Sequence, residues 1–69
     1  MSFSYAVVRV GEIWKVVCAR KAMGFFDTPE TALSAAQSLA REAAGAGHLA
    51  EVLVQSETGE LKPVYFQQL

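Results

Sequence analysis

The sequence is poor in the residues that crosslink small proteins or bind metals in them, namely cysteine and histidine. Cys18 is the single cysteine, so the chain cannot form an internal disulfide. His48 is the single histidine, and no group of cysteines and histidines has the spacing of a zinc site. We therefore expect neither a disulfide framework nor a bound metal.

Long apolar runs are also missing. No stretch is long enough to cross a membrane, and the N-terminus lacks the charged start and apolar core of a secretory signal. We therefore expect a cytoplasmic protein without a membrane contact. The formal net charge of −1 argues against general nucleic-acid binding.

Motifs that carry chemistry are a third absence. The five glycines do not form a phosphate-binding pattern, and no spacing forces two carboxylates together. Nothing places His48 near Cys18 as a base that would activate the thiol. We therefore predict no catalytic residue and no cofactor, and we interpret Cys18 as a small buried hydrophobe.

What remains is a short and apolar chain. Its 69 residues make one domain, 1–69, with a frayed tail at 67–69. A chain of this length buries a modest fraction of its surface and is marginally stable on its own. Because 52% of the residues are hydrophobic, we expect an oligomer interface to use the surplus.

The stretch 28–45 is the one long helical pattern. Thr28 suits an N-cap, and Pro29 takes the first helical position, where its missing N–H costs nothing. Gly45 is predicted to end the helix in the left-handed conformation. Apolar residues recur every three or four positions and form a narrow stripe of Ala32, Leu33, Ala36, Leu39, Ala40 and Ala43. Such a stripe predicts a sheet partner that carries larger side chains.

Two segments rich in β-branched and aromatic residues, 4–10 and 13–19, predict an antiparallel hairpin. The Gly11-Glu12 pair between them suits a two-residue turn of type II′. The resulting register pairs Arg9 with Trp14 on the face that we assign to the helix. On the opposite face, only Lys15 interrupts a set of residues that a monomer would expose: Val8, Val10, Ile13 and Val17.

The segment 20–24 is interpreted as a turn, and Phe25-Phe26 as a short third strand. The direction of the next strand, 49–56, depends on this detail. With a third strand, 49–56 runs parallel to the first strand through a right-handed crossover. Without it, the two strands are antiparallel.

The segments 49–56 and 61–66 predict a second hairpin. Its turn, Glu57-Thr58-Gly59, suits a type I turn with glycine in a left-handed bulge position. This register places Leu53 and Tyr65 on the face away from the helix. Pro63 cannot donate to a strand ladder and therefore marks an edge strand.

These elements define an α+β fold of order ββ(β)αββ, with one mostly antiparallel sheet of four to five strands and a single helix on one face. The inward positions of the strands and of the helical stripe give the predicted core. It consists of Tyr5, Val7, Trp14, Val16, Cys18, Leu33, Ala36, Leu39, Ala40, Val52, Val54, Val64 and Phe66.

Four motifs, covering about residues 5 to 65, resemble a family of small bacterial proteins called domain of unknown function 2188. They are Trp14-Lys15-Val16, Thr28-Pro29-Glu30, Ala50-Glu51-Val52 and the hairpin at Gly59. The resemblance implies a bacterial or phage origin and a ββαββ core, and it implies no activity. The last strand departs from the charged Tyr-Gly end of that family. A weaker likeness is to HicB-type antitoxins, which also place three strands before a similarly capped helix.

Charge is unevenly distributed along the chain. Up to residue 26, Glu12 is the only acidic residue, against four basic ones: Arg9, Lys15, Arg20 and Lys21. With aromatic residues nearby, this basic hairpin is an alternative surface for nucleic acid, as in an antitoxin-like regulator. We favour solvated charges, or contacts between the basic and acidic halves of two subunits, because the overall balance is acidic.

The second apolar sheet face decides our functional prediction. We expect a non-enzymatic protein-interaction module that forms a homodimer or binds a protein partner. The predicted contact residues are Val8, Val10, Ile13, Val17, Leu53 and Tyr65. The alternative is the nucleic-acid-associated regulator.

Overall fold

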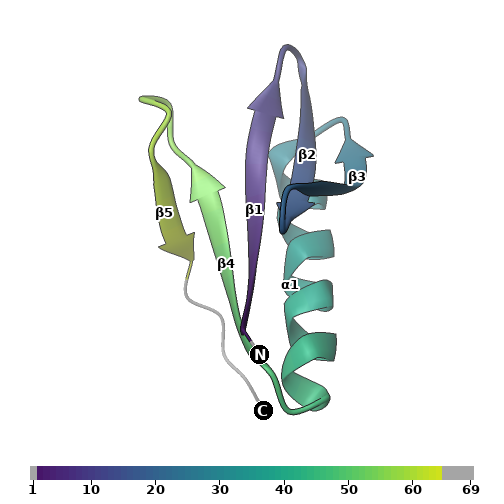
Figure 1. Ribbon diagram of the computed structural model, residues 1–69. Helices are drawn as coiled ribbons and strands as arrows, with labels where there is room; N and C mark the ends of the chain where they lie inside the picture. The colour runs from purple at the N-terminus through teal and green to yellow at the C-terminus, as the bar shows by residue number, and fades with distance from the viewer. Residues whose placement is uncertain (1, 65–69) are drawn as a thin grey trace.

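The computed structural model describes residues 2–64 and places one helix against one side of a five-stranded sheet (Figure 1). In chain order the elements are β1 (Ser2–Val10), β2 (Ile13–Cys18), β3 (Lys21–Phe26), α1 (Pro29–Gly45), β4 (Leu49–Gln55) and β5 (Leu61–Val64). The strand order is β3-β2-β1-β4-β5. The β1–β4 pair is parallel, and the other three pairs are antiparallel. The predicted α+β fold of order ββ(β)αββ is confirmed. Of the two arrangements that the sequence left open, the structure has the one with a third strand, in which β4 runs parallel to β1.

The first hairpin has the predicted register. Arg9 pairs with Trp14, and Val10 pairs with Ile13 at the turn. Gly11 has a φ of +62°, while Glu12 is not among the residues with positive φ, which fits the type II′ turn. The hairpin projects beyond the start of α1 (Figure 1).

The second turn differs from the prediction. Strand β3 begins at Lys21, directly after a two-residue turn, whereas the sequence predicted a turn over 20–24. Ala19 and Arg20 both have positive φ, 53° and 69°, and this makes the turn type I′. Neither residue is typical of that turn, so the sequence carries no signal for it.

Gly24 lies inside β3, opposite Val16, although glycine suggested a break. A Cβ at this position would lie 3.0 Å from the Phe26 ring, so the missing side chain gives that ring its space. Pairing with β2 therefore outweighs the low strand preference of glycine. A register shift between Val16 and Val17 places Met23 as an extra residue of β3.

Helix α1 starts as predicted, and its left-handed cap residue lies two positions later than predicted. The Thr31 N–H donates to Thr28 Oγ1 at 3.2 Å, which satisfies one free donor of the first turn. Gly45 is still helical, and the left-handed residue is Gly47, with a φ of +91°. The Gly47 N–H donates to Ala44 O at 3.0 Å and the His48 N–H to Ala43 O at 3.0 Å. This pair is a Schellman motif, which satisfies the last carbonyls of the helix.

The second hairpin has the predicted bulged turn. The Gly59 N–H donates to Ser56 O at 2.9 Å, the Ser56 N–H donates to Glu60 O at 2.7 Å, and Gly59 has a φ of +91°. Pro63 lies in the edge strand β5, as expected of a residue without an N–H.

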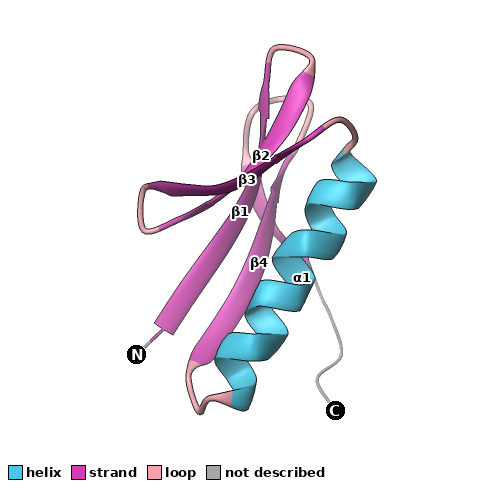
Figure 2. Cartoon of the chain, turned by 90° about the vertical axis from the view of Figure 1, so that its right-hand side faces the viewer, coloured by secondary structure: helices cyan, strands magenta, loops and turns pink. Residues whose placement is uncertain are grey.

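The core lies between α1 and the sheet, where the helix runs along β4 and β1 (Figure 2). Three helix alanines, Ala32, Ala36 and Ala40, are fully buried. Their small side chains let the helix approach the sheet closely, as the narrow stripe predicted. The other buried core residues are Tyr5, Val7, Val16, Cys18 and Val52.

Most of the predicted core is confirmed. Residues that are partly buried against it include Trp14, Leu33, Leu39, Val54 and Val64. Phe66, also predicted for the core, lies outside the described residues. Phe3 and Phe26 join the core without having been predicted.

Candidate functional site

Within residues 2–64, no helix covers the sheet face opposite α1, which we call the open face. Strand pairing puts Ala6 beside Val17 on one side and Leu53 on the other, and it puts Val8 beside Lys15. The predicted contact residues on described strands therefore share this face: Val8, Val10, Ile13, Val17 and Leu53. Tyr65 lies outside the described residues.

Exposed apolar side chains concentrate on the open face. Among the described residues, six large hydrophobic side chains are exposed: Val10, Ile13, Met23, Phe25, Leu49 and Leu61. Five of them occupy open-face positions by register, and the sixth, Met23, lies at the bulge of β3. Phe25 is 62% exposed and Leu49 77% exposed. An apolar surface of this kind usually marks an interaction site.

Four of these exposed residues are absent from the sequence-based contact set: Met23, Phe25, Leu49 and Leu61. Phe25 was assigned to a strand whose length and facing were unknown. Leu49 and Leu61 carried a usable signal, because each is an even number of residues from an open-face partner, Leu53 and Pro63.

The open face carries one positive and one negative side chain within its described strands. Lys15 lies beside Val8 in β2, and Glu51 lies beside Ser4 in β4. The Ser4 hydroxyl donates to Glu51 Oε2 at 2.7 Å. Lys15 lies on the neighbouring strand β2, at the level of the residue two positions after Ala6. Glu51 lies on the other neighbouring strand, β4, at the level of the residue two positions before Ala6. The two charges are therefore placed symmetrically about Ala6.

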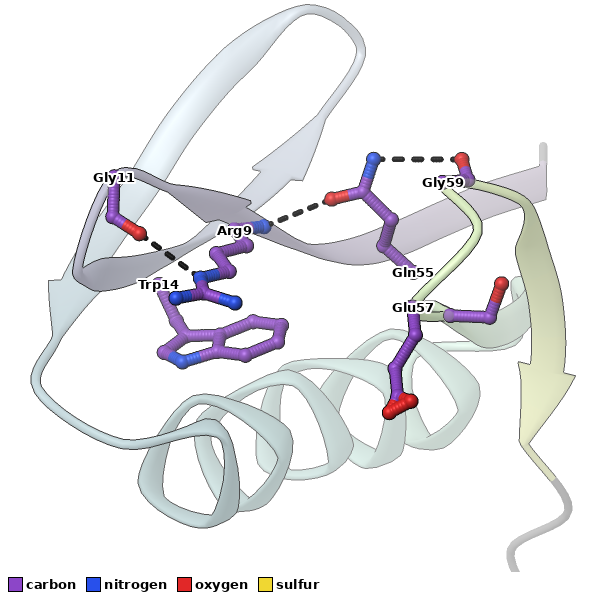
Figure 3. Close-up of a pocket in the computed structure, with 7 residues that line it drawn as sticks. Arg9, Gly11, Trp14, Gln55, Glu57 and Gly59 are labelled. Atoms are coloured by element: carbon purple, nitrogen blue, oxygen red, sulfur yellow. Dashed lines mark hydrogen bonds between the residues drawn. The ribbon is translucent and has the colours of Figure 1, made fainter.

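A cleft of about 390 Å³ lies at the end of the sheet, between the β1–β2 hairpin and the β4–β5 turn, where Arg9 and Trp14 occupy helix-side positions (Figure 3). Its lining includes Arg9, Trp14, Gln55, Glu57 and Gly59. Trp14 was predicted for the core and is half-buried here, because its hairpin projects beyond the helix. The cleft combines an aromatic wall with charges of both signs.

Hydrogen bonds brace the cleft. Arg9 Nε donates to Gly11 O at 2.9 Å. Gln55 connects the two walls, because its Oε1 accepts from the Arg9 backbone N–H at 3.0 Å and its Nε2 donates to Gly59 O at 3.4 Å. No hydrogen bond joins the Arg9 side chain to Glu57, although both line the cleft (Figure 3).

The four basic residues predicted for nucleic-acid contact do not form one patch. Arg9 lies in the cleft on the helix side, and Lys15 lies on the open face. Arg20 and Lys21 lie at the opposite end of β2, about 13 Å along the strand from the Arg9–Trp14 pair.

Neither Cys18 nor His48 belongs to a reactive group. Cys18 is buried in the core. The His48 ring contacts Phe3 edge-on, with ring centroids 5.2 Å apart. Among residues 2–64, no three histidine, cysteine, aspartate or glutamate side chains converge as metal ligands.

The buried phenol of Tyr5 has a perturbed pKa. Burial raises the pKa of its phenol above the ordinary 10.0, and the nearby Cys18 thiol and Glu42 carboxyl raise it further. At pH values between the unfolded-state pKa and the folded-state pKa, the folded chain therefore keeps this proton while the unfolded chain releases it. The stabilising contribution is complete below pH 10 and is lost as pH rises through the folded-state pKa.

Between about pH 9 and 11, the free energy of unfolding should fall less in Tyr5→Phe than in the wild type, because the variant lacks the phenol. Urea unfolding at pH 8, 10 and 11 measures the difference from wild type. Absorbance of phenolate at 295 nm should show a late-titrating tyrosine in the wild type, and the variant should lack this signal. An unchanged late titration in Tyr5→Phe would contradict the assignment.

Comparisons with protein-family models, with curated proteins and with solved structures find no match to this chain. The resemblances to domain of unknown function 2188 and to HicB-type antitoxins therefore stay predictions. The part of the chain that the structure describes contains no helix with the length and apolarity needed to span a membrane. Function is inferred below from the open face and the cleft.

Proposed function

We propose that this chain is a non-enzymatic self-association module in which two copies pack open face against open face. The observation that carries the proposal is the concentration of exposed apolar residues on one side of the sheet, Phe25 and Leu49 above all. Helix α1 covers the other side, so burial of this surface requires a second polypeptide.

The charges favour a second copy as the occupant. A two-fold interface brings the same surface together from both subunits, so it must be self-complementary. Because Lys15 and Glu51 lie symmetrically about Ala6, a two-fold axis through Ala6 can set each Lys15 over a Glu51 of the other copy. The two sheets then cross at a steep angle, which is the orthogonal mode of sheet packing.

The size of the face indicates a weak dimer. Five strands about 4.8 Å apart and about six residues long give a face of about 20 by 20 Å. Two such faces bury about 800 to 1,000 Å², just under the about 1,200 Å² at which standard specific interfaces begin. We therefore expect a Kd on the order of 10–100 µM.

Sedimentation equilibrium from 5 to 500 µM tests the association. The mass should rise from 7.5 kDa towards about 15 kDa. Val17→Glu places a charge at the centre of the open face and should weaken association by about tenfold or more, because the carboxylate would lose its hydration. Ser38→Glu, on the exposed side of the helix, is the control and should dimerise like wild type.

A charge exchange tests the second copy itself. Lys15→Glu should weaken the dimer, and Lys15→Glu combined with Glu51→Lys should restore it, since the pairs form between subunits. Within one chain these residues are about 16 Å apart, too far for a direct ion pair. A wild-type monomer at 500 µM, or a double variant no better than the single one, would contradict the proposal.

The nucleic-acid alternative stays a prediction and is not favoured, because its four basic residues lie on different surfaces. The expected cytoplasmic location and the absence of enzymatic activity stay predictions as well.

A further inference from the structure

The cleft beside Trp14 holds one cation and one anion that do not pair with each other. Arg9 enters it from β1, and Glu57 enters from the β4–β5 turn (Figure 3). Here both charged ends remain available to a third group.

The cation is oriented before any ligand arrives. Arg9 Nε is used by Gly11 O, so the ligand-binding part of the guanidinium is its pair of terminal nitrogens. Gln55 ties the Arg9 backbone to the Gly59 carbonyl and fixes the width between the two walls. A braced fork of two N–H donors suits a carboxylate, which can accept both bonds at once.

The charge balance selects the ligand class. A purely anionic ligand, such as a phosphate, would be repelled by Glu57, and a purely cationic one by Arg9. A ligand with both a carboxylate and an ammonium group satisfies both walls. The half-buried indole of Trp14 offers an apolar surface for the rest of the molecule.

We propose that this cleft binds a zwitterionic α-amino acid with an apolar side chain. Arg9 receives its carboxylate, Glu57 receives its ammonium group, and Trp14 packs against its side chain. The volume of about 390 Å³ is at the small end of ligand pockets, about 300–1,000 Å³. Arg9 and Trp14 occupy helix-side positions of the sheet, so the site does not depend on the proposed dimer.

The test is an NMR titration of the full chain with three ligands that differ in one charge each. L-Phenylalanine has both charges, its N-acetyl derivative lacks the cation, and its amide lacks the carboxylate. The Trp14 indole N–H reports on the cleft directly, because it is the only tryptophan. We expect L-phenylalanine to shift this signal with a Kd on the order of 1 mM, and both derivatives to bind about fivefold or more weakly.

Two variants assign the contacts. Arg9→Gln should weaken binding of L-phenylalanine and of the N-acetyl derivative, and it should strengthen binding of the cationic amide, which Arg9 repels. Glu57→Gln should weaken binding of L-phenylalanine and of the amide, and it should strengthen binding of the anionic N-acetyl derivative, which Glu57 repels. Arg41→Gln, an exposed helix position, is the control and should bind like wild type.

Two results would overturn the proposal. One is no shift of the Trp14 signal at 20 mM L-phenylalanine. The other is equal binding of all three ligands, which would mean contact with the aromatic ring alone. Val17→Glu should keep its ligand affinity, so a failure of the dimer proposal is distinguishable from a failure here.

Discussion

Ala36→Leu is expected to lower the free energy of unfolding by about 3 kcal/mol, because three added carbons must enter a closely packed helix–sheet contact. Ala36 is fully buried and sits at the middle of the alanine stripe. A chain of this length has a total stability of about 3–10 kcal/mol, so the variant should lose between about a third and all of its stability. Urea unfolding followed by circular dichroism measures the change.

Ser38→Leu is the matched control. It adds a leucine two residues away on the exposed side of the same helix, where leucine is a better helix former than serine. We expect its stability to equal or slightly exceed that of wild type. If Ala36→Leu were equally harmless, the helix would not lie as close to the sheet as described.

Replacing the turn Ala19-Arg20 with Asn-Gly is expected to raise the free energy of unfolding by about 1.5 kcal/mol. Both residues adopt left-handed φ angles, which cost a residue other than glycine roughly 1–2 kcal/mol. Asparagine followed by glycine is the preferred pair for a type I′ turn. Glycine adds flexibility to the unfolded chain, which cancels part of the gain.

Thermal unfolding should show a rise of about 6–12 °C in Tm for Ala19→Asn combined with Arg20→Gly. The control is Thr58→Gly, in a turn position without positive φ, and it should lower stability slightly. If the combined variant were no more stable than wild type, the turn would not be type I′.

Residues that mark the start of the helix and the turns of the hairpins made much of the fold predictable from sequence. Thr28-Pro29 marks the helix start, Gly11 and Gly59 mark two hairpins, and each hairpin then determines which residues face the helix. The β2–β3 turn could not be predicted, because Ala19 and Arg20 lack the residue types that its backbone requires. The helix end was placed at Gly45 rather than Gly47 because either glycine can provide a left-handed cap.

The open face was predictable for a similar reason, since alternation along β1 and β2 depends only on the hairpin register. Its symmetry was not, because the positions of Lys15 and Glu51 relative to Ala6 depend on β4 pairing in parallel with β1. Nothing in the sequence indicated the cleft. Arg9 and Glu57 are far apart in sequence, and they share one space only because both hairpins end on the same side of the molecule (Figure 3).

The parallel partnership of β1 and β4 also has a consequence during translation. Ser4 and Glu51, neighbours in the finished sheet, are 47 positions apart. As the nascent chain leaves the ribosome, β1, β2 and β3 can assemble as a meander. The central strand, β1, then has one unpaired edge until β4 has been synthesised. Closing so long a loop delays the final step of assembly. Until then, the unpaired edge of β1 exposes backbone N–H and C=O groups with which another chain can pair. Because α1 directly precedes β4 in the chain, docking of α1 on the first three strands brings β4 close to that edge.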